Sequence, residues 1–115
     1  IMNIRFASFV ALISVFAVAT PALAANGEAL AKEKQCFSCH DLSAEKFAPS
    51  FKDIARRFSG LQNAKRMLAK EVQVGTHASG ITTHWGNMKM NKDTDRVPVS
   101  QAEAEQLVDY ILEVK

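Results

Sequence analysis

The only two cysteines of this 115-residue chain, Cys36 and Cys39, stand three positions apart, and His40 follows them at once. Side chains at this spacing on a helical turn lie on the same side, so both sulfur atoms can reach the edge of one flat ligand. The adjacent imidazole can then point at the centre of that ligand. A chain this short builds only a small apolar core, and small domains commonly depend on a disulfide, a metal or a bound group. These three side chains are therefore the main constraint on the fold.

The first 24 residues have the pattern of a secretory signal peptide. Arg5 precedes an apolar run from Phe6 to Ala19, and Pro21 is followed by the small-residue site Ala22-Leu23-Ala24. The apolar run is shorter than the roughly 20 residues that span a bilayer, which disfavours a membrane anchor. We therefore expect cleavage after Ala24, export to the periplasm, and a single domain over residues 25–115 with no anchor.

The Cys-x-x-Cys-His spacing is typical of covalent c-type haem attachment, in which two thioethers hold the porphyrin and the histidine binds the iron. A covalently bound haem also supplies a large apolar surface around which a small domain can fold.

Three other interpretations compete with haem attachment. A thioredoxin-like redox pair needs a βαβ frame, which the chain's pattern lacks. A structural zinc site usually needs four ligands and would have to recruit His77 and His84. A disulfide across two intervening residues closes too small a loop to constrain the unfolded chain much. The motif, the export signal and the absence of other cysteines agree best with haem.

The mature region is predicted to be all-α, with no strand. Helices are expected from Asn26 to about Cys36, from Ser50 to Phe58, from Leu61 to Val74 and from Ser100 to Lys115. Ser50 with Asp53 and Ser100 with Glu103 have the spacing of N-terminal caps, and Gly75 is a natural stop. Residues 75–99 have no persistent period, and long ordered loops in compact domains are usually functional.

The second axial ligand of the iron is expected to come from that long loop. The candidates are Met88, Met90, His77 and His84, whereas Met67 has the helical spacing of a packing residue. A thioether is a soft ligand that stabilises ferrous haem and raises its reduction potential. The two methionines are favoured over the two histidines, because an isolated histidine in a polar loop is more often solvated.

From about Glu28 to Lys115 the chain resembles the class I cytochromes c, within the small bacterial monohaem group of the c-551/c-552 type. The resemblance rests on four landmarks in order: "CFSCH", "APSFKDIARRF", "HWGNMKM" and the capped final helix with Tyr110. It implies the cytochrome c fold, with about four short helices wrapped around one covalently attached haem c.

The resemblance also implies a role for each matching residue. Cys36 and Cys39 are implied to form the thioethers and His40 to be the proximal ligand, while Met90 matches the distal ligand. Two further residues are implied to make hydrogen bonds in the haem site. Pro49 matches the residue whose carbonyl oxygen accepts the histidine hydrogen bond, and Trp85 matches the residue whose indole donates to a propionate.

Three departures from the family pattern stand out. Lys89 and Asn91 flank Met90 where relatives usually have proline, which leaves Met88 as an alternative ligand. The loop from Gly75 to Trp85 also looks longer than the usual form. Relatives often carry an aromatic residue in the first helix where this chain has Ala31, so we expect a weaker contact with the final helix unless Leu30 and Tyr110 compensate.

The predicted function is that of an electron carrier rather than an enzyme. The expected partners are redox proteins: a membrane cytochrome complex as donor, and a terminal oxidase, a nitrite reductase or a peroxidase as acceptor. Lys34, Lys46 and Lys52 are candidates for guiding a partner with an acidic surface. Scattered basic residues and a formal net charge of +2 give no indication of nucleic-acid binding, and a monomer is expected. The alternative is a haem-based sensor of small ligands, or a weak peroxidase, with an open or labile distal site.

Overall fold

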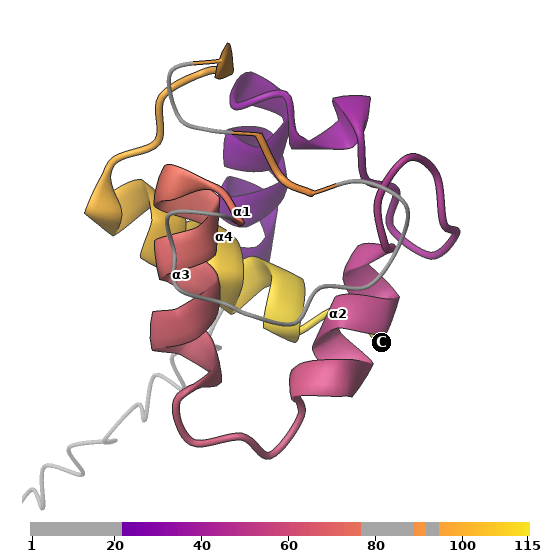
Figure 1. The fold of residues 1–115 in the computed structure, drawn as a ribbon. Helices are drawn as coiled ribbons and strands as arrows, with labels where there is room; N and C mark the ends of the chain where they lie inside the picture. The colour runs from indigo at the N-terminus through magenta and orange to yellow at the C-terminus, as the bar shows by residue number, and fades with distance from the viewer. Residues whose placement is uncertain (1–21, 77–88, 92–94) are drawn as a thin grey trace, which may run out of the picture.

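A computed structural model of the chain describes residues 22–76, 89–91 and 95–115 (Figure 1). It contains four α-helices and one short 3-10 helix: α1 (Ala22–Glu33), η1 (Cys36–Ser38), α2 (Phe51–Phe58), α3 (Ala64–Val74) and α4 (Gln101–Leu112). The described residues contain no strand, so the all-α prediction is confirmed. Within these residues no helix has both the length and the apolar character needed to cross a membrane.

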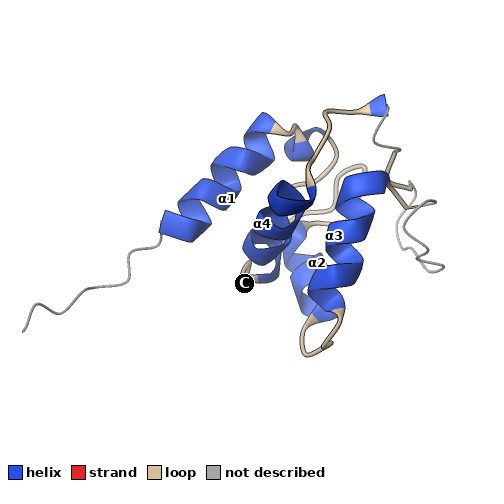
Figure 2. Ribbon diagram, turned by 90° about the vertical axis from the view of Figure 1, so that its left-hand side faces the viewer, coloured by secondary structure: helices blue, strands red, loops and turns tan. Residues whose placement is uncertain are grey.

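The C-terminal helix α4 is the centre of the architecture. It contacts α1, α2 and α3, and Figure 2 shows it between α1 on one side and α2 and α3 on the other. Its inward face is apolar, with Leu107 and Val108 fully buried. The expected capping box is present: Ser100 Oγ accepts from the Glu103 N–H at 3.2 Å, and the Glu103 carboxylate accepts from the Ser100 N–H at 2.9 Å.

The first helix differs from its prediction at both ends. It begins at Ala22 rather than near Asn26, because the alanine-rich start favours helix without a cap. It ends at Glu33 rather than near Cys36, because Gln35 adopts a left-handed conformation with φ of 58°. The chain therefore turns before the cysteines and presents them on a separate 3-10 turn. Residues 1–21 of the predicted signal peptide lie outside the described residues.

Helices α2 and α3 begin and end for local reasons. Ser50 Oγ accepts from the Asp53 N–H at 3.0 Å, as the cap prediction required. The third helix begins at Ala64, three residues later than predicted, and Leu61 is 52% exposed instead of belonging to the apolar face. Helix α3 ends at Val74, and the next residue, Gly75, has φ of 86°. Because L-residues rarely adopt this conformation, glycine explains the stop.

The contact between α1 and α4 is close. Gly27 is buried against Tyr110, so near that a Cβ atom on Gly27 would lie 2.3 Å from the Tyr110 Cβ atom. Ala31 is fully buried in the same core, with Leu30 packed against it. The aromatic ring at this interface therefore comes from α4 alone, and the small residues on α1 make room for it.

Candidate functional site

A cavity of about 340 Å³ lies between the helices, which is within the size range of small-molecule and cofactor sites. Its walls are mainly apolar side chains from α2, α3 and α4 and from the segment before α4: Phe51, Ile54, Phe58, Leu68, Val72, Val97, Val99, Leu107, Val108 and Ile111. Several of these residues also form the protein core. The site is therefore built into the centre of the fold.

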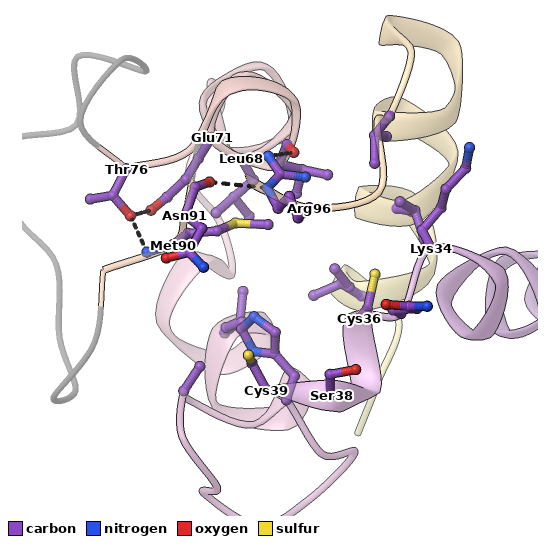
Figure 3. A pocket seen from close by; sticks show the side chains of 18 of the residues that line it. Lys34, Cys36, Ser38, Cys39, Leu68, Glu71, Thr76, Met90, Asn91 and Arg96 are labelled. Atoms are coloured by element: carbon purple, nitrogen blue, oxygen red, sulfur yellow. Dashed lines mark hydrogen bonds between the residues drawn. The ribbon is translucent and has the colours of Figure 1, made fainter. Parts of the chain in front are cut away.

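Both cysteines line this cavity, and both are free thiols. Their 3-10 turn is closed by hydrogen bonds from the backbone N–H groups of Cys39 and His40 to the Cys36 carbonyl oxygen, at 3.3 and 3.0 Å. Figure 3 shows the sulfur atom of each on the cavity side. The turn thus holds two separate thiols at two points of one cavity edge.

The alternative uses of the thiols find no support in the described residues. Burial raises the pKa of the Cys36 thiol, partly offset by the charge of Arg96, whereas redox-active pairs depend on a lowered pKa. Helices surround the motif, and the described residues provide no βαβ frame. The described residues also contain no group of three or more histidine, cysteine or acidic side chains arranged for a metal ion. His77 and His84 lie outside the described residues.

His40 has one ring nitrogen fixed by the backbone. Its Nδ1 atom lies 2.7 Å from the carbonyl oxygen of the buried Pro49, the contact that the resemblance implies. A carbonyl oxygen only accepts, so Nδ1 carries the proton and Nε2 keeps its lone pair in the neutral ring. Burial lowers the pKa of His40, opposed by the Pro49 hydrogen bond and the Glu71 charge. The ring is thus oriented and kept neutral, as a metal-binding imidazole must be.

Met90 lines the same cavity from the loop side, and its side chain is half-buried. In Figure 3 its thioether reaches toward the cavity from the side opposite Cys39. Met67, by contrast, is half-buried on α3 and is not among the described residues that line the cavity. Two other predicted residues, Met88 and Trp85, lie outside the described residues.

Sequence reasoning missed several polar residues of the cavity, among them Glu71, Thr76 and Arg96. Thr76 and Glu71 line the cavity beside Met90, and Thr76 donates a hydrogen bond to Glu71. Arg96 lines it as well and donates from Nε to the Asn91 carbonyl oxygen at 3.0 Å and from Nη2 to the Val72 carbonyl oxygen. These residues have no shared motif or period, so only the position of Thr76 directly after the helix-ending Gly75 gave a signal.

Two of the three candidate docking lysines donate hydrogen bonds inside the structure. The side chain of Lys34 is 12% exposed, and its Nζ atom lies 3.0 Å from Glu103 and donates to the Pro98 carbonyl oxygen at 3.1 Å. Lys34 therefore joins the cysteine turn to the start of α4 instead of presenting a free charge. Lys46 is exposed, yet its Nζ atom donates to the Phe37 carbonyl oxygen at 3.1 Å. Lys52 is also exposed.

Comparisons with known proteins agree on one family. The sequence model of the cytochrome c family matches residues 24–115. Cytochrome c-552 of Hydrogenobacter thermophilus is 39% identical over 88 residues, which cover 76% of this chain and 81% of that protein. Cytochrome c-551 of Stutzerimonas stutzeri is 34% identical over 95 residues, which cover 83% of each chain.

A solved structure agrees with the sequence relatives. The crystal structure of wild-type Nitrosomonas europaea cytochrome c552 superimposes with a TM-score of 0.65 and 31% identity, covering 76% of this chain and 99% of that one. The fold predicted from the resemblance is thereby confirmed.

The residues of the cavity fit the cofactor of this family. Its walls are mainly apolar, two free thiols stand at its edge, and an imidazole with an available Nε2 and a thioether face it. These are the donor groups that a covalently attached haem requires. The chain therefore belongs to the cytochrome c family, in its small class I monohaem group, whose members carry one covalently attached haem c and transfer electrons without being enzymes.

Proposed function

We propose that this protein is a periplasmic electron carrier whose haem c is attached through Cys36 and Cys39 and held axially by His40 and Met90. The observation that carries this proposal is the pairing of donors across one cavity. A neutral imidazole with its Nδ1 proton engaged by Pro49, and a thioether on another segment, face the same apolar space. This pair is the axial set associated with electron transfer at raised potential.

The residues around the cavity suit a carrier. When bound, haem c supplies a one-electron Fe(III)/Fe(II) couple. Pro49 fixes the imidazole plane and raises the basicity of its free nitrogen, and the soft sulfur of Met90 favours the ferrous state. The mainly apolar walls would limit the access of water to the haem, and binding of the iron by both His40 and Met90 would leave no site there for a small molecule.

The proposed location rests on the sequence, and the proposed partners rest on the family to which the chain belongs. The signal-peptide pattern of residues 1–24 supports export to the periplasm. The partners we propose are respiratory redox proteins, namely a membrane cytochrome complex as donor and a terminal oxidase, nitrite reductase or peroxidase as acceptor. Trp85 is proposed to donate its indole N–H to a haem propionate.

The test is a redox titration of the purified holoprotein together with exposure of its ferrous form to carbon monoxide. A carrier with both axial positions filled gives a reversible one-electron titration and resists carbon monoxide. Ready binding of carbon monoxide by the wild-type ferrous protein would overturn the carrier assignment in favour of a small-ligand sensor. Sustained turnover with peroxide would favour a peroxidase.

A further inference from the structure

The backbone of Met90 is bound on both sides by one residue. The Met90 N–H donates to Thr76 Oγ1 at 2.8 Å, and the Thr76 N–H donates to the Met90 carbonyl oxygen at 3.2 Å. Both polar backbone groups of Met90 are therefore satisfied by Thr76. A residue held at its N–H and its carbonyl has its position along the chain fixed, because a shift by one residue breaks both bonds.

The hydroxyl group of Thr76 is itself fixed from the other side. It donates to Glu71 Oε1 at 2.8 Å while it accepts from Met90, and Thr76 is 4% exposed. A hydroxyl group has one proton, so donation to the carboxylate leaves its lone pairs facing the Met90 N–H. Figure 3 shows this chain of hydrogen bonds from Glu71 through Thr76 to Met90.

The same segment is tied to the end of α3. The Gly75 N–H donates to the Glu71 carbonyl oxygen at 2.7 Å, so Thr76 follows directly from an ordered helix end. The two segments also approach closely, because a Cβ atom on Gly75 would lie 2.4 Å from the Asn91 carbonyl oxygen. Helix α3 thereby provides a rigid base for the methionine segment.

We propose that Thr76 is the positioning residue that selects Met90 as the axial ligand and holds it at the iron; this rests on the proposed function. The residues beside Met90, Lys89 and Asn91, lack the fixed φ of proline and leave more backbone freedom to lose on binding. The hydrogen bonds of Thr76, with Glu71 orienting its hydroxyl group, supply the restraint instead.

This role has a measurable consequence for a competing ligand. Carbon monoxide would bind the ferrous iron only after the methionine leaves. Its apparent affinity is therefore its intrinsic affinity multiplied by the fraction of protein in which the methionine has left. Losing the hydroxyl group leaves the Met90 N–H without its partner in a partly buried place. A loss of this kind shifts such an equilibrium by about 5- to 30-fold.

The experiment compares three holoprotein variants with the wild type. Thr76→Val keeps the shape and removes the hydroxyl group, Thr76→Ser keeps the hydroxyl group, and Glu71→Gln keeps an acceptor but removes its charge. The readouts are the near-infrared band of methionine bound to ferric iron and the apparent affinity of the ferrous form for carbon monoxide. We expect Thr76→Val to weaken the near-infrared band and to raise the affinity for carbon monoxide about 5- to 30-fold. Thr76→Ser should match the wild type in both readouts. Glu71→Gln should give values between those of Thr76→Val and the wild type.

A matched control separates positioning from general destabilisation. Ser100→Ala also removes a hydroxyl group that accepts from a backbone N–H, but at the start of α4. It should lower the unfolding midpoint and leave both readouts unchanged. If Thr76→Val does not yield a folded holoprotein, Thr76→Ala takes its place with the same expectation.

The outcomes distinguish this inference from the proposed function. A wild-type protein without the methionine band overturns the proposed function, and this inference with it, before any variant is compared. A wild-type band with unchanged readouts in the Thr76 variants overturns only the role of Thr76. An equal change of both readouts in Ser100→Ala also overturns the role of Thr76, because the readouts would then depend on the stability of the fold alone.

Discussion

His40 owes its orientation to the place where the loop after the cysteine turn meets α2. Pro49 accepts its hydrogen bond, and the next residue, Ser50, is the fully buried N-cap of that helix. Ser50 Oγ accepts from the Asp53 N–H at 3.0 Å and donates to Asp53 Oδ2 at 2.9 Å. The cap therefore fixes the carbonyl oxygen on which the imidazole depends.

Removing this cap should destabilise the holoprotein. We expect Ser50→Ala to lower the free energy of unfolding by about 1–2 kcal/mol, because a buried N-cap hydroxyl group is lost. Denaturant unfolding measures the change, and Ser59→Ala at the exposed other end of α2 is the control. Equal stability of the two variants would show that the cap contributes nothing.

At the scale of elements, sequence reasoning succeeded where the signal was local. Ser50 and Ser100 were identified as caps from residues three positions away, and the structure confirms both. The predicted end of α1 was wrong, because nothing in the sequence marks Gln35 as a residue with positive φ. The predicted start of α3 was also wrong, because Leu61 matches the helical period yet is exposed to solvent. Periodicity does not reveal whether a terminal apolar residue has a partner.

The α1–α4 contact depends on the absence of a side chain at Gly27. We expect Gly27→Val to lower the free energy of unfolding by about 1–3 kcal/mol, because its Cβ atom would overlap the Tyr110 Cβ atom and force the helices apart. Thermal unfolding of the holoprotein measures this. Ala29→Val, on the exposed side of the same helix, should have a much smaller effect. If the Gly27 variant is as stable as this control, the close packing is not important.

The same contact predicts how stability responds to alkaline pH. Burial raises the pKa of Tyr110, with a further increase from Glu28 and an opposing effect from Lys32. The unfolded chain therefore releases the Tyr110 proton first, so its contribution is complete below the unfolded pKa of about 10 and is lost as pH rises through the folded value. Tyr110→Phe should flatten the fall in the free energy of unfolding above about pH 10, measured by denaturant titration. An unchanged pH profile in this variant would contradict the assignment.

On the scale of the whole molecule, the cavity occupies the place of a core. Phe51, Leu107 and Val108 belong both to the buried core and to the cavity wall. Filling the cavity therefore completes the apolar interior of a domain that is small for independent folding.

Loss of the covalent haem attachment should destabilise the whole fold. We expect the double variant Cys36→Ala/Cys39→Ala to lose helical circular dichroism and its cooperative thermal transition, because the apolar walls are then left without a covalently held partner. The single variant Cys39→Ala, with one attachment left, should be intermediate. A double variant with the wild-type transition would show that the helices fold without the attached haem.

The candidate site was partly predictable at this scale. The motif alone indicated Cys36, Cys39 and His40, because their spacing reflects the chemistry of attachment. The resemblance added Pro49, and the structure places its carbonyl oxygen beside His40. Thr76 and Arg96 were not predicted, because their roles depend on which distant backbone groups the fold brings to them. Such pairings leave no pattern in a single sequence.

The near-infrared band of methionine bound to ferric iron tests the central claim most directly, measured on the oxidised wild-type holoprotein and on Met90→Ala and Met88→Ala. We predict the band in the wild type and in Met88→Ala, and its loss in Met90→Ala. A wild-type protein without the band, or a band that survives Met90→Ala, would contradict axial ligation by His40 and Met90.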